Sequence, residues 1–119
     1  MTPSPALSSD LPSLKRVEFL VLTILTDGER HGYGIVQDVG ERSEGAVSMR
    51  PGNLYRVLDR LITRGLVVEG DTAPVTEGGA ERRRFYRITP DGVAAVRAEA
   101  RLLMNMVTSS DALKGAVGT

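Results

Sequence analysis

The sequence predicts a small, mainly α (α+β) fold in which three helices precede a β-hairpin and one long helix follows it. Apolar residues recur at helical spacing up to Gly65, change there to short β-branched runs, and return to helical spacing at Pro90. The chain has 119 residues, of which 41% are hydrophobic, a size that suits one domain with a single core.

The first half of the chain contains signals for two helices. Residues 1–12 are rich in proline and serine and lack a period, so we expect a flexible arm there. Ser13 can cap a first helix, whose apolar residues follow the i, i+3, i+4 rule. A second helix is predicted over residues 31–42, with His31 as a capping or turn residue. Residues 47–49 are long enough only for a short strand.

A third helix is the best defined element. Pro51 suits the first helical turn, and Gly65 suits the left-handed position that closes a helix. The apolar residues between them form one stripe: Leu54, Val57, Leu58, Leu61 and Ile62. The opposite side carries Arg56, Arg60, Asp59 and Thr63, with Asn53 and Tyr55 on its flanks. This outward side is either a solvated surface or a surface for an anionic partner.

After Gly65 the pattern predicts a β-hairpin. Residues 66–69 and 84–89 are short strand candidates, and the fourteen residues between them form a long basic loop. Helix, helix, strand, helix, strand, loop and strand, over residues 13–89, is the order of a winged helix-turn-helix. In that fold the third helix enters the DNA major groove and the hairpin contacts the backbone beside it.

Residues 90–108 predict a C-terminal dimerisation helix. Apolar side chains are spaced as at the a and d positions of a heptad: Val93, Val96, Ala100, Leu103 and Val107. Such a face needs a partner surface, and a second copy would give a two-fold homodimer that matches palindromic DNA. The same face could also pack on the first helix of its own chain. Beyond residue 108 the pattern is lost, so residues 109–119 are predicted to form a disordered tail.

Positive charge is concentrated in two short segments. The chain has 15 basic and 15 acidic residues, yet residues 50–64 and 80–87 each hold four arginines against one acidic residue. Because an electrostatic field acts locally, two such segments on an otherwise acidic chain indicate a localised anion-binding surface.

Other features exclude whole classes of function. The sequence has no cysteine, which rules out disulfides, and no apolar run that approaches a membrane span. His31 is the only histidine, and no carboxylate cluster has metal-ligand spacing. We therefore expect a cytoplasmic protein without a membrane partner, metal or cofactor, and not an enzyme.

The chain contains four short motifs in a fixed order: His31-Gly-Tyr-Gly-Ile, Pro51-Gly-Asn-Leu-Tyr, Gly65-Leu-Val and Arg82-Arg-Arg-Phe-Tyr-Arg-Ile-Thr-Pro-Asp-Gly. Together they resemble the PadR family of bacterial transcriptional regulators, over residues 14–107. The resemblance implies a winged-helix DNA-binding domain, dimerisation through the C-terminal helix, and repression relieved by a small aromatic or drug-like effector. The single C-terminal helix is similar to that of the short subfamily. Asn53 stands where the family usually has Ser or Thr, and the chain has no tryptophan for a stacking pocket.

The residues expected to contact double-stranded DNA lie on the second and third helices and the hairpin loop: Tyr33, Asn53, Tyr55, Arg56, Arg60, Arg82, Arg83 and Arg84. For Arg56 and Arg60 we expect contacts to guanine or phosphate, although arginines on solvated helix faces are also common. Asp59 could pair with Arg56 or accept a hydrogen bond from a cytosine amino group. Tyr33 could instead pack at the edge of the core.

Two other functions stay open. A winged helix can serve as a protein-interaction module, and a small hydrophobic or aromatic effector could bind a dimer that has lost DNA binding. In the second case the effector would occupy a cavity at the dimer interface, to which Phe19, Leu103 and Met104 could contribute. A salt-sensitive, sequence-selective complex with DNA would distinguish a regulator from both.

Overall fold

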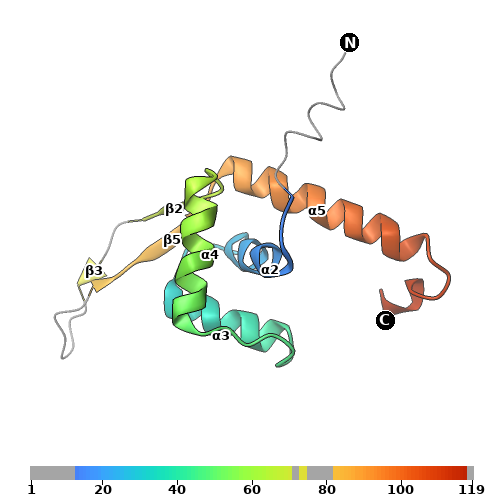
Figure 1. Ribbon diagram of the computed structural model, residues 1–119, viewed down its shortest axis with the longest axis horizontal. Helices are drawn as coiled ribbons and strands as arrows, with labels where there is room; N and C mark the ends of the chain where they lie inside the picture. The colour runs from blue at the N-terminus through green and yellow to red at the C-terminus, as the bar shows by residue number, and fades with distance from the viewer. Residues whose placement is uncertain (1–12, 71–72, 75–81, 118–119) are drawn as a thin grey trace, which may run out of the picture.

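The computed structural model describes residues 13–70, 73–74 and 82–117, and the expected arm of residues 1–12 lies outside them (Figure 1). The described chain opens with the helices α2 (Arg16–Leu25), α3 (Gly32–Arg42) and α4 (Pro51–Thr63). The strands β2 (Val67–Glu69) and β5 (Phe85–Ile88) and the long helix α5 (Pro90–Thr108) follow. This order confirms the winged helix-turn-helix predicted from the sequence.

The start of α2 differs from the prediction. Ser13 does not cap this helix; the N-cap is Lys15, whose backbone N–H donates to Glu18 Oε1 at 2.9 Å. A carboxylate in the first turn can satisfy this N–H, so the helix begins two residues later than a serine cap would place it. Glu18 is therefore turned back towards the start of its own helix.

A small antiparallel sheet has the strand order β1-β5-β2. Its first strand is β1 (Arg30–His31), which pairs with β5 through His31 and Phe85, while β2 lies on the other side of β5. The strand predicted at residues 47–49 is absent, because this segment has no regular structure and pairs with no strand of the described chain. The two residues directly before α3 complete the sheet instead.

The hairpin is prolonged by a second, shorter ladder. In it β3 (Ala73–Pro74) pairs antiparallel with β4 (Arg82–Arg83). These two strands, which we call the wing, project away from the helices at the left of Figure 1. Part of the predicted long loop is therefore strand.

The core lies between α2, α3, α4 and the sheet. The apolar stripe of α4 is confirmed: Leu54, Val57, Leu58 and Leu61 are buried, and Ile62 is partly buried. The stripe forms one cluster with residues such as Leu22 of α2 and Ile35 of α3. Gly65 then follows α4 with a φ of 77°, the left-handed conformation expected of it. The buried stripe thus determines how α4 packs on the core, and therefore which side of the helix faces solvent.

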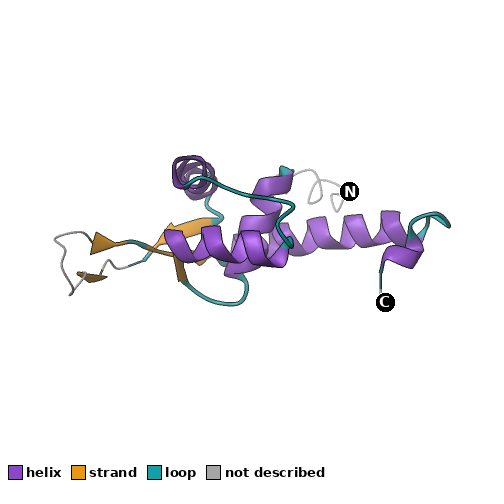
Figure 2. Cartoon of the chain, turned by 90° about the horizontal axis from the view of Figure 1, so that it is seen from below, coloured by secondary structure: helices purple, strands orange, loops and turns teal. Residues whose placement is uncertain are grey.

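The helix α5 has two halves with different surroundings. Its first half lies against α2 and β5, where Ala95 and Val96 are buried. Its second half extends beyond the other helices (Figures 1 and 2). Residues 109–117, expected to lack regular structure, include the short 3-10 helix η1 (Lys114–Ala116). No helix in the described ranges is both long and apolar enough to span a bilayer.

A close joint connects the start of α5 to the end of α4. Thr89 Oγ1 donates to the Gly65 carbonyl oxygen at 2.7 Å and accepts the Gly92 N–H at 3.0 Å. The backbone of Gly92 lies directly against Leu66, so that an added Cβ would collide with the Leu66 carbonyl oxygen and lie 2.7 Å from Ile88 Cγ1. We call Gly65, Leu66, Thr89 and Gly92 the α4–α5 joint.

His31 caps α3, as predicted. Its Nδ1 accepts the Gly34 N–H at 3.1 Å, and its ring makes an edge contact with Phe85, with ring centroids 5.9 Å apart. We expect His31→Ala to lower the free energy of unfolding by about 1 kcal/mol, because the first turn of α3 loses its acceptor. The change His31→Asn, which keeps a capping acceptor, should cost less. Urea unfolding of both variants measures the difference, and equal losses would exclude the cap as the cause.

Candidate nucleic-acid interface

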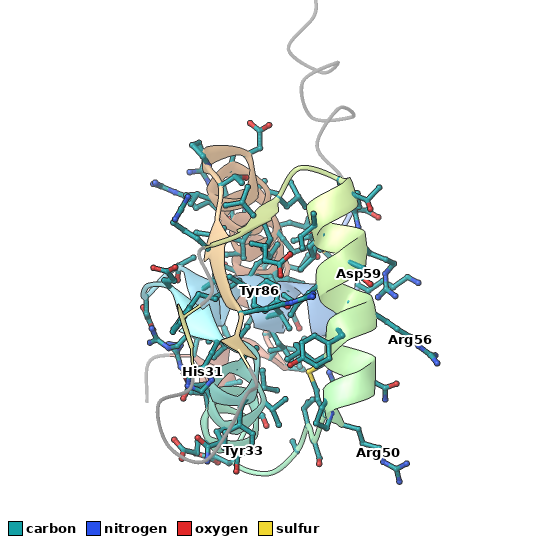
Figure 3. The ribbon with its side chains drawn as sticks, turned by 90° about the vertical axis from the view of Figure 1, so that its left-hand side faces the viewer. His31, Tyr33, Arg50, Arg56, Asp59 and Tyr86 are labelled. Carbon is teal, nitrogen blue, oxygen red and sulfur yellow. The ribbon has the colours of Figure 1, made fainter. Side chains whose placement is uncertain are left out.

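The helix α4 presents a basic surface on the side opposite its buried stripe. Figure 3 shows Arg50 and Arg56 pointing away from the body of the domain. Within the described ranges, neither of these arginines forms an ion pair. Both guanidinium groups can therefore bind an external anion. We call the exposed residues here the α4 surface: Arg50, Gly52, Asn53, Arg56, Asp59 and Thr63.

The first turn of α4 is open to an anion. Its N-cap residue is Arg50, whose side chain makes no capping hydrogen bond, so the first backbone N–H groups lack a serine or aspartate acceptor. An added Cβ on Gly52 would find no atom of the described residues within 4 Å. The positive end of a helix, with no side chain in front of it, suits a phosphate that approaches the backbone closely.

Asp59 lies on the α4 surface without the arginine partner considered for it. No ion pair between Asp59 and Arg56 occurs in the part of the chain that the structure describes, and Asp59 is exposed (Figure 3). A contact of Asp59 with the amino group of a cytosine stays a prediction.

Arg60 and Arg64, near the other end of α4, bind a carboxylate inside the protein. Glu18 of α2 is 1% exposed; its Oε2 accepts from Arg60 Nε and its Oε1 from Arg64 Nη1, both at 3.1 Å. Burial raises the pKa of the Glu18 carboxyl, but hydrogen bonds from the Lys15 N–H and both arginines outweigh it, so the pKa lies below its ordinary value. Glu18 is therefore ionised, and Arg60, predicted to face DNA, is directed towards α2.

Glu18 was overlooked in the sequence, although a signal for its burial exists. Val21, Leu22 and Leu25 follow it at i+3, i+4 and i+7, which places the carboxylate on the buried side of α2. A buried carboxylate needs a cationic partner. Its partners come from 42 and 46 positions further along the chain, and only the fold brings them to it.

The two tyrosines predicted to contact DNA differ in their surroundings. Tyr33, in the first turn of α3, is 62% exposed. The ring of Tyr55 covers the backbone of Gly32, where an added Cβ would lie 2.9 Å from the Tyr55 hydroxyl oxygen. Tyr55 therefore packs α4 against the start of α3, and the more exposed Tyr33 is the better suited of the two to a phosphate contact.

The hairpin and wing supply the other arginines of the predicted interface. Arg84 Nε forms an ion pair with Glu69 Oε2 at 3.1 Å across the hairpin. Arg82 and Arg83 form β4, and their side chains lie outside the described part of the structure. Contact of Arg82 and Arg83 with DNA stays a prediction.

The residues predicted for the dimer interface divide between the two halves of α5. Val96 is 5% exposed and belongs to the core of its own chain, as in the alternative in which the heptad row packs on the first helix. The other members of the row are half-buried or exposed: Val93, Ala100, Leu103 and Val107. Of the residues predicted for an effector cavity, Phe19 packs partly against the core, whereas Leu103 and Met104 are exposed on α5.

The chain is similar in sequence to known regulators. Residues 21–98 match the family model described as Transcriptional regulator PadR-like family. The chain is 37% identical over 87 residues to Transcriptional regulator Rv3488 of Mycobacterium tuberculosis, and this alignment covers 73% of this chain and 75% of that protein.

Solved structures share the fold. A transcriptional regulator from Clostridium thermocellum has a TM-score of 0.63 at 23% identity, covering 80% of this chain and 92% of that chain. Bacillus subtilis PadR in complex with operator DNA has a TM-score of 0.62 at 21% identity, covering 72% of this chain and 47% of that chain. At these identities the likeness concerns the fold alone.

Proposed function

Because this chain belongs to the Transcriptional regulator PadR-like family, we propose that it represses transcription by binding a palindromic operator as a homodimer, and that a small effector relieves the repression. The family consists of transcriptional regulators and not of enzymes. One observation carries the proposal. On the α4 surface, Arg56 forms no ion pair within the described ranges, points away from the domain (Figure 3) and follows a helix start without a side-chain cap.

In the proposed complex, α4 lies in the major groove of double-stranded DNA. Arg56 contacts a guanine edge or a phosphate, and Asn53 is placed to bond an adenine edge. The first N–H groups of α4 bind a phosphate together with Arg50. The wing, with Arg82 and Arg83, follows the flanking backbone. Bacillus subtilis PadR, which has the same fold and is known in complex with operator DNA, supports operator DNA as the partner.

A second copy of the chain is the partner proposed for the exposed half of α5. Large apolar side chains gather there: Leu102 is 53% exposed, Leu103 42%, Met104 45% and Met106 61%. Burying such a side chain fully is worth roughly 1.5–3 kcal/mol, so several together favour association. An isologous contact between two α5 helices would place two α4 helices in the two-fold arrangement of a palindromic site.

The variant Leu103→Asp should be monomeric and should lose operator binding, since a carboxylate buried in an apolar interface without a cation is costly. Light scattering after size exclusion gives the mass. As a control, Leu113→Asp changes a side chain that is 52% exposed and lies after α5, and it should leave the dimer intact. A dimeric Leu103→Asp would contradict the α5 interface.

The effector part of the proposal concerns a cavity at the interface of the proposed homodimer. Phe19 on α2 and Leu103 and Met104 on α5 would offer apolar contacts to a small hydrophobic or aromatic ligand. A ligand that prefers one arrangement of the two α5 helices shifts the protein towards that arrangement. Release of operator DNA by an aromatic compound, followed by fluorescence anisotropy, tests this part.

Footprinting on the promoter DNA of the chain's own gene tests the DNA-binding proposal. The protected site should have two-fold symmetry, and affinity should fall steeply as salt rises, because phosphate contacts release counterions. Binding of equal strength to promoter and random DNA, or no binding to either, would rule out a sequence-specific regulator.

A further inference from the structure

Glu18 is a buried charge that the proposed DNA contacts do not use. Both carboxylate oxygens are occupied, Oε2 by Arg60 Nε and Oε1 by Arg64 Nη1 and the Lys15 backbone N–H. One of these arginines, Arg60, follows Arg56 by four residues, about one turn of α4. A guanidinium that could extend the basic surface of α4 is thus directed inwards.

We propose that Glu18 acts as an internal substitute for a DNA phosphate: it keeps Arg60 bound to the protein, so that Arg56 contacts DNA and Arg60 does not. Glu18 is in this sense a specificity-determining residue. The inference rests on the proposed DNA-binding function and adds to it which arginine of α4 is withheld, and by what.

The chemistry of the two anions explains the substitution. Carboxylate and phosphate oxygens accept from guanidinium N–H groups with similar geometry. Glu18 is 1% exposed, whereas the side chain of Arg60 is 43% exposed. Removing Arg60 from a buried carboxylate leaves that charge partly unpaired, which costs more than breaking a surface ion pair. Arg60 therefore stays with Glu18 when a phosphate approaches.

Arg64 responds differently to the loss of Glu18. It has a second partner, the Ser13 carbonyl oxygen, which accepts from Arg64 Nη2 at 2.8 Å. Arg60, by contrast, forms no other ion pair or side-chain hydrogen bond within the described ranges. Neutralising Glu18 thus releases Arg60 in particular.

Withholding Arg60 favours sequence selection. A contact to phosphate adds equally to operator and random DNA, whereas contacts to base edges add only to the operator. A regulator with one phosphate contact fewer in each chain binds random DNA more weakly. Its ratio of specific to non-specific affinity then depends more on Arg56 and the other base contacts than on phosphate contacts.

The test is the salt dependence of binding to a random 20-base-pair duplex by wild type, Arg60→Gln, Glu18→Gln and the double variant. Arg60→Gln should have the salt slope of wild type. Glu18→Gln should have a steeper slope by about 1 per chain, so that a homodimer loses roughly tenfold more affinity between 50 and 200 mM salt. The double variant should return to the wild-type slope, which a merely structural role of Glu18 would not produce.

Asp27→Asn is the matched control. It makes the same change of charge and releases Arg42, an arginine that does not belong to α4. In the wild type, Arg42 Nη1 lies 2.9 Å from Asp27 Oδ2. A slope as steep as that of Glu18→Gln would assign the effect to net charge and overturn the proposal. If the affinity of Arg60→Gln depended less steeply on salt than that of wild type, the proposal would also be overturned, since Arg60 would then already contact DNA in the wild type.

The remaining outcomes are also decisive. If Glu18→Gln does not fold, Arg60→Gln still decides, because an unchanged slope supports the inference and a reduced slope refutes it. If wild type binds neither operator nor random DNA, the proposed function and the inference fail together. If wild type binds DNA and folded Glu18→Gln keeps the wild-type salt slope, the inference alone fails and the proposed function stands.

Discussion

Gly92→Ala is expected to lower the melting temperature by roughly 12–24 °C, which corresponds to about 3 kcal/mol of lost stability. The added methyl group would collide with the backbone carbonyl oxygen of Leu66 and lie 2.7 Å from Ile88 Cγ1. A backbone carbonyl cannot rotate away as a side chain can, so α5 must shift relative to the hairpin. Helix propensity alone favours alanine over glycine, so a loss would report the clash. Thermal unfolding followed by circular dichroism measures it.

Gly52→Ala is the control for this experiment. Gly52 also lies in the first turn of a helix that begins with proline, but an added Cβ there meets no atom within 4 Å in the part of the chain that the structure describes. Its melting temperature should be unchanged or slightly raised. If Gly92→Ala had the melting temperature of wild type, the backbone of Gly92 would not lie close enough to Leu66 for an added methyl group to matter.

Arg56→Ala should weaken binding to the operator by about 1–3 kcal/mol, or roughly five- to 150-fold in Kd, and should relax base preference at one position of each half-site. The reason is its place on the α4 surface, where no carboxylate in the described ranges competes for it. Arg83→Ala, in the wing, should instead weaken operator and random DNA alike. Anisotropy titrations with both DNAs at two salt concentrations measure these losses.

Arg42→Ala provides the comparison for Arg56. It removes the same charge from the end of α3, where Arg42 is bound to Asp27. Operator affinity should change little. If Arg56→Ala and Arg42→Ala bound operator equally well, α4 would not be the helix that reads the DNA.

The boundaries and the buried face of α4 could be predicted because the sequence signals for them are local and agree with one another. Pro51, the apolar stripe and Gly65 each act within a turn or two of the helix, and all point to the same boundaries and the same buried face. The cap at His31 is likewise a contact over three residues. Such features depend little on what the rest of the chain does.

The features that the sequence did not disclose depend on distant partners. The strand β1 has two residues, too few for a periodic pattern, and it exists because β5 pairs with it. Residues 47–49 contain only one β-branched residue, Val47, and no strand of the described chain lies beside them to pair with. Arg60 belongs to an exposed row on α4 by its spacing, yet the buried carboxylate of Glu18 on α2 decides its direction. In each case tertiary contact outweighs local propensity.

The α4–α5 joint also bears on the distance between the two α4 helices in the proposed homodimer. The end of α4 is tied to the start of α5 by one hydroxyl group and a glycine contact. In the proposed homodimer we therefore expect α4 and α5 of each chain to move together, with α4 at one end and the dimer contact at the other. Half-sites one helical turn apart require the two α4 helices to be held about 34 Å apart. In such a homodimer, a small change of the crossing angle between the α5 helices would produce a large change of the distance between the two α4 helices. The spacing of the half-sites would then depend on a contact between protein chains that does not touch the DNA.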